Sequence, residues 1–274
     1  MGKFGSPEVL CGALSIVGES PAWNARRSQL ATIDVHGQRV RFFDWNLRRA
    51  EDVVLDERPG AAIWLPDGRL AVACGKSILA LDSNRRLVPL VSSLPLDGIR
   101  FNDVKMGPDG WFWGGTYTMS TTGGAFYRIS PTGECVRMFG DVGNSNGIDW
   151  DLERCFFYHI DTPKGTVVRY RYDPGTFDLA DRRVLRTFGK DEGLPDGMVR
   201  DPDGLLWIAL WGSSRVVAID PDSGEEADEI RLPVSQPTCP AFAGNGRMVI
   251  TTAAHGLNLR EEPLAGATFA VELR

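Results

Sequence analysis

The chain has 274 residues, of which 43% are hydrophobic and 24% are charged, which is typical of a folded globular protein and excludes disorder as its main state. Its 30 Lys and Arg residues against 36 Asp and Glu residues give a formal net charge of −6. Nucleic-acid binding usually needs an excess of basic residues that neutralise phosphates, so this charge predicts no nucleic-acid partner.

The sequence also gives no sign of a membrane segment. No stretch approaches the roughly 18 apolar residues that a membrane-spanning helix needs, and the first ten residues lack the apolar run of a secretion signal. We therefore expect no membrane partner and a cytoplasmic protein. The five cysteines are odd in number and never form a C-x-x-C pair, so neither a disulfide framework nor a thiolate zinc site is predicted.

A turn followed by an apolar strand recurs six times along the chain. The turns start at Asn24, Pro66, Pro108, Asp151, Pro202 and Gly244. Their spacings are 42, 42, 43, 51 and 42 residues, a period typical of four-stranded propeller blades. We predict an all-β fold with a single domain over residues 1–274, a six-bladed β-propeller of four-stranded antiparallel blades.

Short runs rich in Val, Ile, Leu and aromatic residues, bounded by Gly, Pro, Asp and Asn, are the predicted strands. In chain order they are 19–24, 28–35, 37–45 and 51–57; 61–66, 66–74, 76–82 and 86–94; 102–108, 108–116, 124–130 and 134–141; 146–151, 151–161, 165–173 and 182–188; 196–202, 202–210, 214–220 and 228–233; and 240–244, 244–253 and 267–273.

The last of these six groups lacks a fourth strand, while the N-terminal run 8–19 has no partner. We therefore expect the N-terminal strand to close the ring by completing the C-terminal blade, which removes two exposed edges. The 51-residue spacing predicts a loop near residues 173–182. No window sustains a helical period, so long helices are not expected.

The loop that enters each innermost strand opens onto the central channel, so equivalent repeat positions are expected to be neighbours. About five residues before each turn lie Glu19, Ala61, Asp103, Asn146, Asp196 and the pair Thr238 and Cys239. Four of the six blades thus offer an oxygen ligand to one axis. Carboxylates facing each other in a narrow channel would repel strongly without a cation, and oxygen ligands suit a hard divalent ion.

Several stretches carry a family resemblance: GESPAW, RFNDVKMGPDGWFWGGT, SNGIDWD, GLPDGMVRDPDGLLWIALWG and LPVSQPTCPAF. In this order they resemble the senescence-marker-protein/regucalcin/gluconolactonase family over nearly the whole chain. The resemblance implies a six-bladed propeller with one central divalent cation, calcium first, with magnesium, manganese, zinc and iron as alternatives. It implies Glu19, Asn146 and Asp196 as metal ligands, and Arg100 and Asn102 as substrate contacts.

One segment departs from the family pattern. Where the family's sugar lactonases often carry an acidic pair that touches substrate hydroxyls, this chain has Met119 and Ser120. We place Ser120 with Arg100 and Asn102 among the expected substrate contacts, and the departure leaves the identity of the sugar open.

The expected reaction is the hydrolysis of a small sugar-derived lactone, an aldono-1,4- or 1,5-lactone, to the aldonic acid. A lactone needs a polarised carbonyl, a nucleophilic water and stabilisation of the oxyanion. The cation would polarise the carbonyl, and Asp196 or Asp103 would act as the general base. The alternatives are a calcium-binding regulatory or scaffold propeller and a related metal-dependent phosphoesterase.

Two further patterns are assigned no catalytic role. Residues 143–147 spell G-x-S-x-G, but that motif works on a strand-to-helix turn, and here it lies between two strands. The three histidines, His36, His159 and His255, fall at unmatched repeat offsets and are expected to be surface or strand-end residues.

Overall fold

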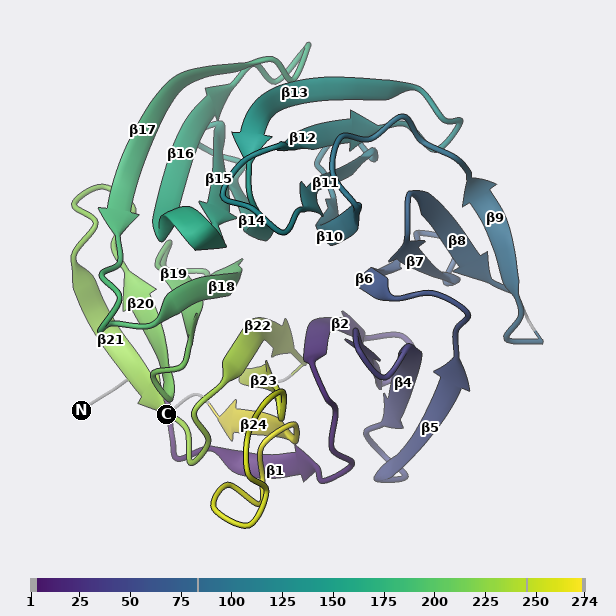
Figure 1. Cartoon of the computed structure of the whole chain (residues 1–274), viewed down its shortest axis with the longest axis vertical. Coiled ribbons are helices and arrows are strands. Elements are labelled where there is room, and N and C mark those ends of the chain that lie inside the picture. The colour runs from purple at the N-terminus through teal and green to yellow at the C-terminus, as the bar shows by residue number, and fades with distance from the viewer. Residues whose placement is uncertain (1–3, 83, 245, 273–274) are drawn as a thin grey trace.

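The computed structural model describes residues 4–82, 84–244 and 246–272, and its regular structure consists almost entirely of strands. Six four-stranded sheets are arranged around a central axis (Figure 1). Neighbouring strands within these sheets run antiparallel. The predicted six-bladed β-propeller is therefore confirmed.

In each blade the first strand lies beside the axis and the last lies at the rim (Figure 1). The strands are β1 (Glu8–Cys11), β2 (Gly18–Asn24), β3 (Gln29–Asp34), β4 (Arg39–Asp44), β5 (Arg49–Val54), β6 (Pro59–Trp64), β7 (Leu70–Cys74), β8 (Ser77–Leu81), β9 (Leu87–Val91), β10 (Arg100–Met106), β11 (Phe112–Tyr117), β12 (Gly124–Ile129), β13 (Cys135–Val142), β14 (Ser145–Asp151), β15 (Phe156–Asp161), β16 (Thr166–Tyr172), β17 (Leu179–Thr187), β18 (Leu194–Arg200), β19 (Leu206–Trp211), β20 (Arg215–Ile219), β21 (Glu226–Arg231), β22 (Pro237–Ala243), β23 (Arg247–Thr252) and β24 (Thr268–Glu272).

The N-terminal strand closes the ring, as predicted. β1 pairs antiparallel with β24, with Glu8 opposite Ala270, so the last blade has the order β22, β23, β24, β1. The closing strand is shorter than the predicted run 8–19, because residues 12–17 form the connection to the first blade and β2 begins at Gly18. Pairing the two ends of the chain in one sheet removes the open edges that a broken ring would expose.

The fourth blade, β14 to β17, contains the longest repeat, and its predicted loop is partly wrong. Residues 173–178 form the turn, but β17 begins at Leu179, which pairs with Tyr172 of β16.

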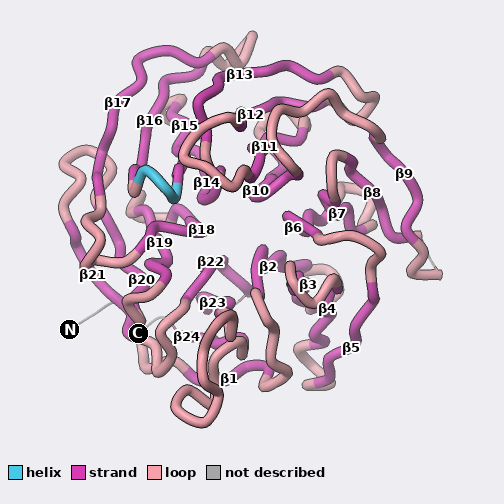
Figure 2. The backbone as a smooth tube through the Cα atoms, viewed as in Figure 1, coloured by secondary structure: helices cyan, strands magenta, loops and turns pink. Residues whose placement is uncertain are grey.

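A 3₁₀ turn at Thr162–Lys164 follows β15 and is the one helix among the described residues (Figure 2). Within the same residues, no helix has the length and apolar character that crossing a membrane requires.

The apolar core lies between neighbouring blades. Trp207 on β19 is fully buried and belongs to one cluster with Met248 and Phe269 of the last blade. Phe4, just ahead of β1, packs edge to face against Trp207 with ring centroids 5.0 Å apart. These contacts hold the blades at fixed positions around the ring, and with them the six innermost strands that build the channel.

Candidate functional site

All six innermost strands carry a β-bulge or irregularity at their first residues. The register shifts lie between Glu19 and Ala22, Pro59 and Ala61, Phe101 and Val104, Asn146 and Ile148, Pro195 and Met198, and Pro237 and Cys239. A bulge bends its strand and redirects side chains, and bulges are frequent beside functional sites. The predicted polar positions lie within or next to these bulges, so the same local irregularity directs each side chain toward the axis.

Glycines allow the innermost strands to approach each other closely at this level. A Cβ atom on Gly147 would lie 2.9 Å from the carbonyl oxygen of Asp196, and one on Gly197 would lie 2.7 Å from the Cα atom of Cys239. Such contacts are too short for any other residue. Gly147 and Gly197 directly follow Asn146 and Asp196, so this close packing brings those two functional side chains together.

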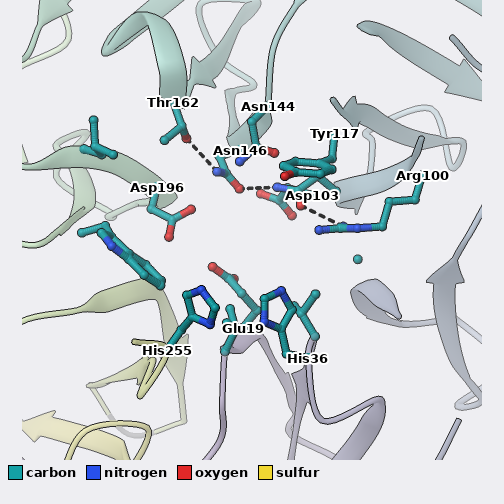
Figure 3. A pocket seen from close by; sticks show the side chains of 16 residues that line it. Glu19, His36, Arg100, Asp103, Tyr117, Asn144, Asn146, Thr162, Asp196 and His255 are labelled. Carbon is teal, nitrogen blue, oxygen red and sulfur yellow. Dashed lines mark hydrogen bonds between the residues drawn. The ribbon is translucent and has the colours of Figure 1, made fainter. Parts of the chain in front are cut away.

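The bulges surround a pocket of about 270 Å³ at one end of the channel (Figure 3). Its polar lining comes from Glu19, Arg100, Asn102, Asp103, Asn144, Asn146, Thr162 and Asp196. This volume lies just below the roughly 300–1,000 Å³ that is common for ligand pockets, so a ligand would have to be small. The sequence positions Ala61, Thr238 and Cys239 contribute no side chain to it. Ala61 and Thr238 are fully buried elsewhere, and Cys239 lines a different cavity.

A chain of hydrogen bonds fixes the amide of Asn146. Its Nδ2 donates to Thr162 Oγ1 at 2.7 Å, and Thr162 Oγ1 donates to the carbonyl of Pro195 at 2.7 Å. On the other side, Asn102 Nδ2 donates to Asn146 Oδ1 at 2.7 Å and to the carbonyl of Ser145 at 2.8 Å. Both ends of the amide are thus held by neighbours, and Oδ1 keeps a second lone pair for a ligand.

Two carboxylates in the pocket face each other in a poorly solvated environment. Glu19 and Asp196 both point into the same central space in Figure 3. Burial, together with the negative charges of Asp196 and Asp103, holds the pKa of Glu19 well above its usual value. Burial and the charge of Asp103 likewise raise the pKa of Asp196. The backbone N–H of Ser20 donates to Glu19 Oε2 at 2.8 Å, and Arg100 lowers the pKa of Glu19, but burial and repulsion outweigh both.

Asp103 lies at the boundary between the two halves of the channel. It lines the pocket, and it also lines a second cavity of about 430 Å³ together with Lys105 and Cys239. Its Oδ2 atom is buried and has no hydrogen-bond partner. Burial raises the pKa of Asp103, against the positive charge of Lys105, which lowers it. Lys105 Nζ is itself fixed by the carbonyl of Met198 at 2.9 Å.

The donor atoms fit a hard divalent cation. In residues 4–82, 84–244 and 246–272, no three His, Cys, Asp or Glu side chains form a group that could hold a metal. An ion at this site therefore requires the amide oxygen of Asn146 beside the carboxylates of Glu19 and Asp196. Calcium and magnesium bind amide and carboxylate oxygens. The buried, incompletely compensated carboxylates of Glu19 and Asp196 are what a cation would be expected to relieve.

Ser120 is not brought to the site. It lies in the exposed segment 118–123, outside the pocket lining, and its Oγ accepts a hydrogen bond from the backbone N–H of Thr122 at 3.4 Å. Neighbouring Met119 is 87% exposed. Arg100 and Asn102, the other two predicted substrate contacts, both line the pocket.

Several pocket residues were missed because they follow second strands. They are His36 after β3, Tyr117 at the end of β11, Thr162 after β15, Trp211 at the end of β19 and His255 after β23. The second strand of a blade runs antiparallel to the first, so its end lies at the same face as the start of the innermost strand. Reading both positions in every repeat would have found them.

The histidine prediction is correct in part. His36 and His255 do follow strand ends, but both line the pocket, with ring centroids 4.8 Å apart. The prediction is wrong for His159, which lies within β15 and is 2% exposed. Its Nε2 atom lies 2.9 Å from the Oγ atom of the fully buried Ser145, the serine of the G-x-S-x-G pattern.

Comparisons with known proteins agree with these motifs. A family model described as the SMP-30/Gluconolactonase/LRE-like region matches residues 17–254. The chain is 34% identical to the regucalcin of Danio rerio, over 93% of this chain and 90% of that protein. It is 33% identical to the "Putative sugar lactone lactonase YvrE" of Bacillus subtilis strain 168, over 94% of this chain and 92% of that protein.

Solved structures share the fold. One is a calcium-binding protein, regucalcin, from Agrobacterium tumefaciens, with a TM-score of 0.90 and 24% identity over 98% of this chain and 94% of that chain. Another is a gluconolactonase from Xanthomonas campestris, with a TM-score of 0.80 and 20% identity over 98% of this chain and 89% of that chain. At these identities the likeness concerns the fold.

Proposed function

The chain belongs to the SMP-30/gluconolactonase/LRE-like family and is a lactone-hydrolysing enzyme, and we propose that it opens a small sugar-derived lactone with the help of one divalent cation. The substrate would be an aldono-1,4- or 1,5-lactone and the product the aldonic acid. The observation that carries this proposal is the meeting of Glu19, Asn146 and Asp196 in one small pocket beside Arg100 and Asn102.

Glu19, Asn146 and Asp196 would hold the cation. Calcium is the ion we propose, because the donor set is made of oxygen atoms and a structural relative is described as calcium-binding. When bound, a divalent cation supplies Lewis-acid polarisation of the lactone carbonyl. The remaining work falls to side chains of the chain itself.

Arg100 and Asn102 would orient the lactone. Arg100 Nη1 donates to the carbonyl of Phe101 at 2.7 Å and to Asn102 Oδ1 at 3.0 Å, which fixes the guanidinium against the amide. The guanidinium also lies over the ring of Tyr117, 4.8 Å from its centroid. A group held on three sides can present its remaining N–H bonds to substrate oxygens with little loss of entropy.

We assign Asp103 as the general base. Its side chain lines the pocket, and burial raises its pKa, which makes the carboxylate a stronger proton acceptor than an exposed aspartate. The Asp103 carboxylate would take one proton of the attacking water as the water oxygen bonds to the carbonyl carbon. The same proton would return to the ring oxygen as the ring C–O bond breaks, leaving a hydroxyl and a carboxylic acid.

A lactone panel tests the proposed function. Purified protein with Ca²⁺ is expected to release protons from aldonolactones well above the spontaneous rate, and a chelator is expected to abolish this acceleration reversibly. An aryl phosphate and a fluorophosphate serve as comparison substrates in the same pH-indicator assay. Hydrolysis of the phosphoesters alone would favour a phosphoesterase. Metal binding with every lactone left at its spontaneous rate would favour a regulatory calcium-binding propeller.

Asp103→Asn tests the base. The variant is expected to bind Ca²⁺ as the wild type does and to lose about 10²- to 10⁴-fold in kcat, since it keeps the shape of the site but removes the proton acceptor. Titration calorimetry measures the metal, and steady-state kinetics measures kcat. Full activity in Asp103→Asn would transfer the role to Asp196, the alternative carboxylate.

Thr162→Val tests the support of Asn146. The valine keeps the side-chain shape but leaves Asn146 Nδ2 without its acceptor, and lost outer-shell partners typically lower metal affinity about 10- to 100-fold. Calcium titration of the purified variant measures the change. Thr187→Val on the exposed rim strand β17 is the matched control, with wild-type affinity expected. Equal affinity in both variants would remove Thr162 from this role.

A further inference from the structure

One part of the pocket carries three basic side chains, and Figure 3 shows Glu19 beside them. Arg100, His36 and His255 form this side, which we call the basic wall, and Figure 3 shows the Arg100 guanidinium directed into the pocket on the same side as His36. The two imidazoles meet edge to face with centroids 4.8 Å apart. The wall thus gathers guanidinium and imidazole N–H groups around one part of the pocket, beside the space that the cation would occupy.

Arg100 lacks an anionic partner. Among the described residues, no carboxylate lies within ion-pair distance of its guanidinium, although most arginines of the blades are paired. Within the same residues its Nε and Nη2 atoms donate no hydrogen bond, because its protein contacts use Nη1. The charge of Glu19 acts on this guanidinium from beyond ion-pair distance, so its compensation is incomplete, and a ligand anion would complete it.

Charges of both signs surround the basic wall, since Asp34 raises the pKa of His36, and the exposed Asp56 and Glu57 precede Arg58 in the connection before β6. Arg58, in the connection before β6, is exposed, and its charge contributes to lowering the pKa of both His36 and Arg100. Burial is the larger cause of the lowered pKa of His36. The segment 118–123 after β11, which reads TMSTTG, contains no charged side chain. The carboxylates of Glu19 and Asp196 would be compensated by the cation.

We propose that the basic wall, with Arg58 beside it, binds an anionic substituent of the lactone, a carboxylate or a phosphate attached to the sugar away from the reacting carbonyl. This inference rests on the proposed function and narrows its substrate class. Imidazole and guanidinium N–H groups both donate to carboxylate and phosphate oxygens, and the guanidinium fork matches either anion with two hydrogen bonds.

Matched substrate pairs test this proposal. Glucono-1,5-lactone is compared with 6-phosphoglucono-1,5-lactone, and glucono-1,4-lactone with glucaro-1,4-lactone, with the Ca²⁺-loaded enzyme. We expect kcat/KM for at least one anionic lactone to exceed that of its neutral partner about 10- to 100-fold, mainly through KM. A preference for 6-phosphoglucono-1,5-lactone would identify the anion as a phosphate, and a preference for glucaro-1,4-lactone would identify it as a carboxylate. Added KCl is expected to reduce the preference by screening.

Variants of the basic wall and of Arg58 test which side chains cause the preference for anionic lactones. Arg58→Gln and the double variant His36→Gln/His255→Gln are expected to reduce the anionic-to-neutral ratio of kcat/KM several-fold. Arg26→Gln, in the exposed turn after β2, is the charge-matched control, with an unchanged ratio expected. Neutral lactones hydrolysed as well as both anionic ones would overturn this inference and leave the lactonase function standing. Failure to hydrolyse any lactone would overturn both.

Discussion

Replacing Glu19 with Gln is expected to stabilise the metal-free protein and to inactivate the enzyme. The carboxylate is poorly solvated and faces Asp196 and Asp103, so its charge disfavours the folded state above its pKa. Removing the buried negative charge of Glu19 is expected to raise the free energy of unfolding at pH 8 by about 1–3 kcal/mol. Activity is expected to fall at least about 100-fold, since one transition-state electrostatic group is lost with the cation.

Three measurements on one preparation check this expectation. Denaturant unfolding in the presence of a chelator gives the stability, calcium titration gives the affinity, and the lactone assay gives kcat/KM. Glu153→Gln, in the exposed turn after β14, makes the same chemical change outside the channel and is expected to leave all three unchanged. A Glu19→Gln protein that binds calcium as tightly as the wild type would show that Glu19 is no ligand.

Such opposite effects on stability and activity are typical of functional sites. In this chain the fold confines the conflict between stability and activity to the channel, because four innermost strands place acidic or amide side chains around one axis. The blades themselves carry the compensating stability through buried aromatic and aliphatic side chains such as Trp207 and Phe269. The scaffold can therefore tolerate repulsion at its centre.

The repeat pattern alone predicted most of the fold. Turn spacing and apolar runs identified the strands, since each blade repeats the same local chemistry, and the unpaired run 8–19 indicated the closing strand. Strand ends were less predictable. In the fourth blade, Leu179 and Ala180 pair with β16 although the preceding residues form a turn, because ladder pairing extends as far as the partner strand allows.

The site could be predicted where it follows the repeat. Glu19, Asn146 and Asp196 occupy equivalent positions, and rotational pseudo-symmetry brings equivalent positions together whatever their separation in sequence. Ser120 lies in an exposed segment whose path no repeat defines. His36 and His255 were missed because only the innermost strands were read, and the roles of all these side chains stay predictions.

The increase in melting temperature that calcium causes is expected to grow with pH. In the metal-free folded state, burial holds the pKa values of Glu19 and Asp196 above their unfolded values, which are near 4. The folded state therefore binds more protons than the unfolded state in this window. Stability from these two groups is fully present below about pH 4 and is lost as the pH rises through the folded pKa values.

Calcium reverses that loss, because ligand carboxylates must release their protons to bind it. At pH 5 protons compete with the ion and weaken its binding, so a fixed CaCl₂ concentration is expected to shift the melting temperature less than at pH 7.5. At pH 7.5 the shift is expected to be large, since a ligand at 100 times its Kd adds about 2.7 kcal/mol. Differential scanning calorimetry with CaCl₂ or chelator at each pH measures the difference, and groups whose titration is independent of calcium cancel from it.

In Asp196→Asn the pH dependence of the calcium shift is expected to flatten. A calcium shift that is larger at pH 5 than at pH 7.5 in the wild type would contradict binding through these two buried carboxylates.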